Sequence, residues 1–266
     1  MRVKGDGIFS INTSASGGFG NAKISLPETV ADASGGADSP PITDNLSIYF
    51  NPDVEVYSDA GTTLAVDGDN IRQYNDQSGN SNTAEHSTAS VQPIYKTSVL
   101  GGGNASIFTG SNDRLNLTST IVIPDLSSWT FYTVYKRDPV GDWGVALGNA
   151  SGAPSANIIF RSIGLRASDD SNQYSYIWNA EDTTLKIMTV VVDSSANTIS
   201  LYKNNTLVQT QSLTYSDTFT FKNLYFHAGL PTPDTNWGNM LLYTDLHDAT
   251  QVGEVNDWLN TKYSIY

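Results

Sequence analysis

The sequence predicts an all-β protein: a two-sheet antiparallel sandwich of the jelly-roll type, with one C-terminal helix and an extended N-terminal arm. From Leu46 onward, short apolar or alternating segments recur about every 8–12 residues, and Gly, Asn, Asp and Pro separate them. Only the last stretch of the chain has a helical pattern. The strands must therefore pair with one another rather than alternate with helices, as they would in a parallel α/β fold.

Residues 1–45 differ from the predicted sandwich, residues 46–266. Glycines and the segment ADASGGADSPPITD interrupt every periodic pattern, which is typical of a linker. We predict that this arm docks on another protein chain by adding a strand to an exposed sheet edge. The alternative is an arm that folds back on its own domain as an edge strand. The apolar side chains available for docking are Ile8, Phe9, Ile11, Phe19, Ile24 and Leu26.

Within the predicted sandwich, the clearest strands come in order along the second half. Residues 128–137 alternate between two faces, and residues 185–193, 197–203 and 207–213 predict a meander. The pair Asn204-Asn205 tolerates the left-handed backbone that a tight hairpin turn requires. Further strands are predicted in the segments 219–229 and 237–244.

The final segment, ATQVGEVNDWLNTKY, predicts a helix. Val252, Val255 and Leu259 lie on one face of it, and Asp248 stands where it can cap the first turn.

Composition excludes several classes of protein. The chain of 266 residues has no Cys, so it is not a disulfide scaffold, and its length supplies a large core without such links. Its 14 Lys and Arg against 27 Asp and Glu give a net charge of -13, which argues against nucleic acid and anionic membranes as partners. The N-terminus has no apolar core of a secretory signal. We expect a cytoplasmic product, an excised signal, or a particle component released by lysis.

Three segments carry a resemblance to a known family. Residues 69–87 contain a DQSGN turn, and the step Gln92-Pro93-Ile94-Tyr95 and the strand in residues 105–117 follow it. Residues 186–208 form a strand–turn–strand unit, and residues 237–265 end in "WLNTKY". Together these segments resemble the laminin-G-like branch of the concanavalin A-like lectin/glucanase superfamily. This chain departs from the family pattern at Tyr74 (often Trp), Asn205 (Gly) and Leu241 (often Glu).

The resemblance implies a jelly-roll sandwich, and this superfamily includes both lectins and glucanases. Retaining glycosidases need two carboxyl groups about 5–5.5 Å apart, and the glucanase branch resembles E-x-D-x-E. None of the five Glu residues begins such a triplet, and the three His lie in unrelated contexts without a G-x-S-x-G motif. We therefore predict no catalytic residues and no enzyme activity. A glycoside hydrolase with an unfamiliar carboxylate pair is the least favoured alternative.

The resemblance also implies calcium as a candidate ligand, because lectins of this kind often use it. Asp67, Asp69 and Asp76 lie in two oxygen-rich loops and are the candidate Ca²⁺ ligands. Asp and Asn also close turns with their own backbone, and we favour that interpretation. The sequence predicts no cofactor, with calcium as the alternative.

Sugar binding needs exposed aromatic faces beside polar groups. Tyr174, Tyr176 and Trp178 share one face of a predicted strand, and Asp142 and Trp143 lie in a loop between two strands. These five residues are the predicted glycan-binding candidates, and the alternative is that the aromatic side chains belong to the core. Trp129, Trp237 and Trp258 are predicted to pack.

The functional prediction is a non-enzymatic virion protein, a structural, decoration or tail-associated component of a particle such as a bacteriophage. Its arm would contact other virion proteins or sister copies, so the chain would be oligomeric in the assembly, and its outward face would bind host or environmental glycans. The alternative is an extracellular or cell-surface carbohydrate-binding module of a bacterial adhesin or polysaccharide-degrading enzyme.

Overall fold

The computed structural model describes residues 39–109, 113–137, 143–148, 157–161, 164–168, 174–178, 183–214, 218–225 and 235–266. The chain divides into two units, residues 1–36 and residues 37–266. The six apolar side chains predicted to dock the arm lie outside the described residues.

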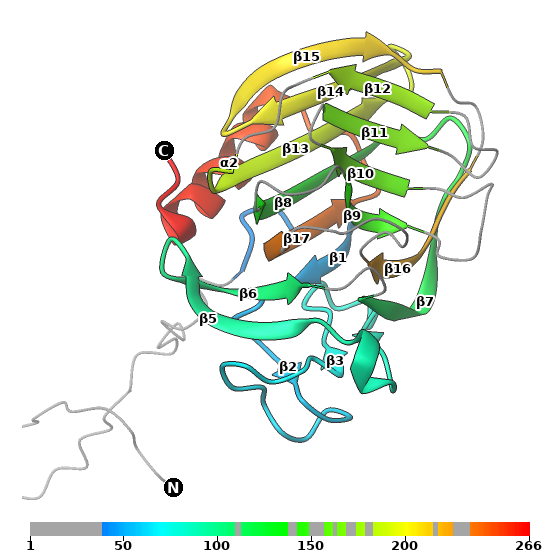
Figure 1. The fold of residues 1–266 in the computed structure, drawn as a ribbon. Helices are drawn as coiled ribbons and strands as arrows, with labels where there is room; N and C mark the ends of the chain where they lie inside the picture. The colour runs from blue at the N-terminus through cyan, green and yellow to red at the C-terminus, as the bar shows by residue number, and fades with distance from the viewer. Residues whose placement is uncertain are drawn as a thin grey trace, which may run out of the picture. The chain divides into compact units, whose positions relative to one another are not determined.

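The first sheet, sheet A, brings together strands from the beginning and the end of the sandwich's sequence (Figure 1). In spatial order its strands are β15 (Thr206–Ser212), β14 (Thr198–Lys203), β13 (Lys186–Asp193), β8 (Trp129–Arg137), β17 (Thr235–Tyr243), β6 (Gly103–Phe108) and β5 (Ile94–Leu100), with β1 (Leu46–Phe50) also beside β17. The predicted meander is confirmed as β13, β14 and β15. Asn204 and Asn205 have φ of 49° and 62°, which is the left-handed backbone expected for the second turn.

The second sheet, sheet B, faces sheet A. In spatial order its strands are β12 (Tyr174–Trp178), β11 (Gly164–Ser168), β10 (Asn157–Arg161), β9 (Trp143–Gly148), β16 (Phe219–Tyr225), β7 (Arg114–Ile123), β4 (Ala84–Glu85), β3 (Gln73–Tyr74) and β2 (Val56–Tyr57). The strand pairs in both sheets are antiparallel. The predicted class, a two-sheet antiparallel sandwich with one C-terminal helix, is confirmed for the part of the chain that the structure describes.

A first apolar core fills the space between the two sheets. Trp129 and Trp237 are 0% and 1% exposed in it, as predicted, and the Tyr74 ring lies tilted against that of Phe50 with ring centroids 5.0 Å apart. A smaller aromatic residue therefore fills the position where the resembled family often has Trp. Since these side chains come from strands far apart in the sequence, the core fixes both sheets at once.

A second apolar core lies on the other face of sheet A, under helix α2 (Ala249–Tyr263). Val255, Leu259 and Tyr263 of the helix pack here, together with Leu241, which is 0% exposed. The strand predicted in residues 128–137 is present as β8, and its two faces alternate. Both faces are buried: Tyr132 and Val134 pack in the second core under α2, and Thr130 lies against the segment that precedes α2.

Helix α2 begins as the sequence predicts. The Asp248 side chain accepts hydrogen bonds from the backbone N–H of Thr250 and Gln251, and the Gln251 side chain accepts one from the Asp248 N–H. This capping box satisfies backbone donors that no helical carbonyl reaches. At the other end Tyr263 packs on Gly238 of β17, where a Cβ would lie 2.8 Å from the Tyr263 hydroxyl. Gly238 therefore allows the close approach of the helix.

The last residues of the predicted arm contact the sandwich. Ile42 packs against the second core, and its carbonyl accepts a hydrogen bond from the Tyr243 hydroxyl at 2.9 Å. The Asn45 side chain donates one to Asp245 at 3.0 Å. Packing against the sandwich thus begins before Leu46, and the division of function at residue 45 stays a prediction.

Candidate functional site

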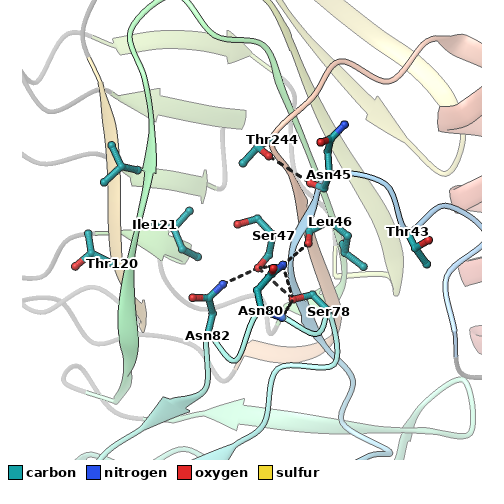
Figure 2. Close-up of a pocket in the computed structure, with 11 residues that line it drawn as sticks. Thr43, Asn45, Leu46, Ser47, Ser78, Asn80, Asn82, Thr120, Ile121 and Thr244 are labelled. Atoms are coloured by element: carbon teal, nitrogen blue, oxygen red, sulfur yellow. Dashed lines mark hydrogen bonds between the residues drawn. The ribbon is translucent and has the colours of Figure 1, made fainter.

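A polar groove of about 560 Å³ lies where the start of β1 approaches β7 and the loop between β3 and β4 (Figure 2). Most of its lining is hydroxyl or amide side chains. The lining residues are Thr43, Asn45, Leu46, Ser47, Ser78, Asn80, Asn82, Thr120, Ile121, Val122 and Thr244. None of them carries a charge at neutral pH.

One wall of the groove is the DQSGN turn, which Asp76 holds in shape. Its carboxylate accepts hydrogen bonds from the backbone N–H of Tyr49 at 2.8 Å, Ser78 at 2.9 Å and Asn82 at 3.0 Å. It also accepts one from the Ser78 hydroxyl at 2.7 Å. A carboxylate with four donors is committed to the turn, so Asp76 acts as a structural corner.

Three side chains of this turn fasten it to the chain that enters β1. Asn80 donates to the Leu46 carbonyl at 2.6 Å, and Asn82 and Ser78 donate to the Ser47 carbonyl at 2.8 Å and 3.2 Å. Figure 2 shows these bonds converging on one side of the groove. The backbone oxygens at this wall are therefore partnered, and the groove is a preformed surface rather than a loose loop.

The opposite wall comes from β7. Thr120 is exposed, and Val122, 52% exposed, adds an apolar edge. At the upper end of the groove the Thr244 backbone N–H donates to the Asn45 carbonyl at 2.9 Å, which ties the chain leaving β17 to the chain that enters β1. The groove thus offers uncharged donors and acceptors around an apolar edge, which suits a polyhydroxylated, uncharged ligand.

The candidate calcium ligands do not come together. Asp67 accepts from the Thr97 N–H at 3.0 Å and pairs with Lys96 at 3.2 Å, and these contacts lower the pKa of Asp67, the Thr97 N–H most of all. Asp69 accepts from the Val66 N–H at 2.9 Å. Asp69 thus closes its own turn as predicted, whereas Asp67 ties its loop to β5. Across the described ranges, no group of three or more His, Cys, Asp or Glu has the arrangement that holds a metal ion.

The predicted glycan-binding residues lie elsewhere in sheet B. Tyr174, Tyr176 and Trp178 belong to β12, where the intervening Ser175 and Ile177 are buried. Trp143 begins β9. The side chains of these four residues lie outside the described part of the structure, as does Asp142 entirely, so the structure leaves their predicted role open.

The sequence did not predict the groove residues, because the residues predicted to bind sugars were aromatic and the groove lining has no aromatic side chain. One signal did point here. The segment DQSGNSN is unusually dense in short polar side chains, and the resemblance identified it as a corner. A corner rich in Asn and Ser presents spare hydroxyl and amide groups beside those that hold the turn.

No family model and no curated protein matches this chain. Solved structures do match, among them the binding domain of Paraclostridial Mosquitocidal Protein 1, with a TM-score of 0.59 and 14% identity over 83% of this chain and 53% of that one. The botulinum neurotoxin serotype D binding domain matches with a TM-score of 0.54 and 11% identity over 81% of this chain and 51% of that one. A serotype D ligand binding domain in complex with N-acetylneuraminic acid matches with a TM-score of 0.55 and 12% identity, again over 81% and 51%.

This chain spans about half the length of each of those domains. At such identities the likeness establishes the fold alone, a jelly-roll-like β-sandwich. As for membranes, none of the helical segments described above has the length and apolar character needed to cross one.

Proposed function

We propose that residues 46–266, together with Thr43 and Asn45 of the arm, form a non-enzymatic carbohydrate-binding domain and that the polar groove is its binding site. The observation that carries this proposal is the groove itself: about 560 Å³, lined mostly by hydroxyl and amide groups and free of charged side chains. Sugar hydroxyls are both donors and acceptors, and Thr, Ser and Asn side chains match them in both roles. Val122 supplies an apolar edge for the C–H face of a sugar ring.

Two further points support binding rather than catalysis. The groove lining contains no carboxylate, whereas glycoside hydrolysis uses a pair of them. The structural neighbours are toxin binding domains, and one of them holds N-acetylneuraminic acid. We carry the general role of binding over to this chain as part of the proposal.

A substitution that fills the groove tests it. Thr120 is an exposed strand residue, so Thr120→Trp should block the groove while the fold stays intact. The matched control is Thr206→Trp, at an exposed position of the edge strand β15 in sheet A. A glycan array would identify a neutral binder, and calorimetry would measure it.

We expect Thr120→Trp to lower the affinity for that glycan at least tenfold and the control variant to bind it like the wild-type protein. Because we propose that no calcium is required, EDTA should leave binding unchanged. Equal binding by both variants, or no bound glycan on the array, would contradict the proposed site.

We further propose, from the three resembling segments within residues 69–265, that the sandwich belongs to the laminin-G-like branch, and from the sequence of residues 1–45 that it is carried on a virus particle. The arm would dock on shell or tail proteins or on sister copies, giving an oligomeric assembly with the sandwich outward. The alternating apolar residues Ile8, Phe9 and Ile11 support this, because strand addition needs such a pattern. Limited proteolysis tests it: rapid cleavage within residues 1–45 of the free chain should disappear on assembly, and an arm resistant in the monomer would contradict it.

The alternative, an extracellular module of an adhesin or polysaccharide-degrading enzyme, predicts the same groove binding without arm protection. Electron microscopy of particles labelled with an antibody to the sandwich separates the two settings. Label on the particle surface supports the virion proposal.

A further inference from the structure

A second, smaller pocket of about 170 Å³ lies on sheet B, between the end of β4 and the middle of β7. Its polar lining residues are Arg72, Glu85, His86, Ser87, Asn116 and Thr118. Unlike the neutral groove, this pocket carries charged side chains of both signs. Such a pocket selects its ligand by charge as well as by hydrogen bonding.

Two arginines lie at this pocket or close to it, in a chain whose net charge is -13. Arg72 lines the pocket, and Arg114 lies two residues before Asn116 on β7; both side chains are half-buried. In the part of the chain that the structure describes, neither guanidinium makes a side-chain hydrogen bond or an ion pair. A half-buried guanidinium with unused donors is a ready partner for an anion, and a carboxylate fits its fork geometry best.

His86 adds a neutral donor to the same pocket. The backbone N–H of Thr88 donates to His86 Nδ1 at 3.1 Å, so the proton of the neutral ring is on Nε2. Burial, and then the charge of Arg114, lower the pKa of His86, which keeps this neutral form at pH 7. His86 Nε2–H is therefore a donor that does not depend on protonation.

Acceptors for hydroxyl groups lie beside these donors. Glu85 is exposed at the pocket, and it faces Asn116 across the β4–β7 pair. Asn116 is held in place, because its Oδ1 accepts a hydrogen bond from Asn223 Nδ2 at 2.6 Å. A ligand that satisfies both groups needs an anion for the guanidinium and hydroxyls for the carboxylate.

We infer that this pocket binds an acidic sugar unit, with the sugar carboxylate on Arg72 and the ring hydroxyls toward Glu85 and Asn116. This inference deepens the proposed function and rests on it, because both sites lie along β7. Asn116–Thr118 line the pocket, and Thr120–Val122 line the groove. Four residues of strand span roughly 13 Å, so one oligosaccharide running along β7 reaches both sites.

Calorimetry with the full chain and two matched ligands tests the inference: an oligogalacturonate and its fully methyl-esterified form, which lacks the negative charge. We expect the wild-type protein to prefer the acid form, and added salt to reduce that preference. Arg72→Met should lower the affinity for the acid form about tenfold or more and leave the affinity for the ester unchanged. Glu85→Gln should raise the affinity for the acid form several-fold, because it removes a carboxylate that repels the carboxylate of the ligand. The control is Lys136→Met, which makes the same change of charge at an exposed position of sheet A.

Each outcome decides between the pocket and the groove. Equal binding of acid and ester by the wild-type protein, or a preference that survives Arg72→Met, overturns the pocket while the groove proposal stands. A sulfated oligosaccharide that binds as tightly, with the same dependence on Arg72, overturns the carboxylate assignment. If Arg72→Met weakens the acid form but Thr120→Trp changes no binding, the pocket stands and the groove fails. Binding of neither ligand, with an empty glycan array, overturns both.

Discussion

The central strands of the two sheets differ in how their outer faces are covered. In β8 of sheet A, the seven residues 129–135 are all buried, because the first core lies on one side and α2 on the other. In β7 of sheet B, buried residues such as Leu115 and Leu117 alternate with exposed ones such as Asn116 and Thr118. The centre of sheet A is thus an interior layer, whereas the outer face of β7 is open. Both proposed binding sites lie along the open strand, where side chains can change without disturbing a core.

Covering sheet A requires its polar groups to find partners under the helix. The Thr130 hydroxyl donates to the Asp245 carbonyl and accepts from the His247 N–H, each at 3.0 Å. The Thr189 hydroxyl donates to Asn256 Oδ1 at 3.0 Å. These bonds fix how the C-terminal segment sits on sheet A, because a polar group left unpaired here would cost about 1–3 kcal/mol.

The largest expected effect comes from breaking the covered face. Leu259 of α2 is 0% exposed in the second core, so Leu259→Ala should lower the free energy of unfolding by about 2–5 kcal/mol. On the open face, Val122→Ala should change it by no more than about 0.5 kcal/mol. Urea denaturation measures both. Similar losses in the two variants would show that the contrast between the sheets is wrong.

The second effect tests how rigid the open side is at the groove. Asp76→Ala removes a carboxylate that accepts four hydrogen bonds and should lower the free energy of unfolding by about 2–3 kcal/mol. Asp69 accepts a single bond of this kind, so Asp69→Ala should cost about 1 kcal/mol. Chemical denaturation of the two variants gives the comparison. A loss for Asp76→Ala no larger than that for Asp69→Ala would mean that the turn is not held by its carboxylate.

Local features of the molecule were predictable from the sequence, and features assembled from distant segments were not. The Asn204-Asn205 turn and the Asp248 cap depend on neighbouring residues, so residue type alone indicates them. The groove depends on contacts such as Asn82 with Ser47, which are 35 residues apart, and on β7 opposite them. No local pattern shows which polar residues will converge, and the aromatic residues directed attention to β9 and β12 instead.

The double burial of β8 has the same origin. The alternation of Thr130, Tyr132 and Val134 with the core residues is visible in the sequence, and it is typical of a strand with one open face. The helix that closes this face begins more than a hundred residues later, as the separation of 115 between Tyr132 and His247 shows. An amphipathic helix indicates that it covers something, without indicating which sheet.

A smaller effect is expected where the helix begins. Asp248→Ala removes the cap that accepts the N–H groups of Thr250 and Gln251, and it should lower the free energy of unfolding by about 1 kcal/mol. Glu254→Ala, at an exposed position within the same helix, is the control and should stay within about 0.5 kcal/mol. Thermal unfolding followed by circular dichroism separates them. An unchanged midpoint for Asp248→Ala would imply that tertiary packing alone sets the start of α2.

The smallest effect is a pH dependence that compares one histidine on each side of the molecule. His247 is buried beside α2, with Nδ1 2.7 Å from the Tyr132 hydroxyl and its ring 4.2 Å from that of Tyr243. Burial lowers the pKa of His247 below its ordinary value of 6.5, although the carboxylates of Asp245 and Asp248 act in the opposite direction. Below pH 6.5 the unfolded chain therefore binds more protons than the folded one, so the free energy of unfolding falls as pH falls through this window.

His86, in the open-face pocket, has a pKa lowered in the same direction but is only half-buried, so its contribution should be the smaller one. Urea denaturation between pH 7.5 and pH 5 should show a slope that His247→Gln flattens clearly and His86→Gln flattens less. A greater flattening by His86→Gln, or a slope untouched by His247→Gln, would mean that the histidine under the helix is better solvated than its burial indicates. In that case the covered and open faces would differ in packing alone, and burial under the helix would not lower the pKa of a histidine more than burial in the open-face pocket does.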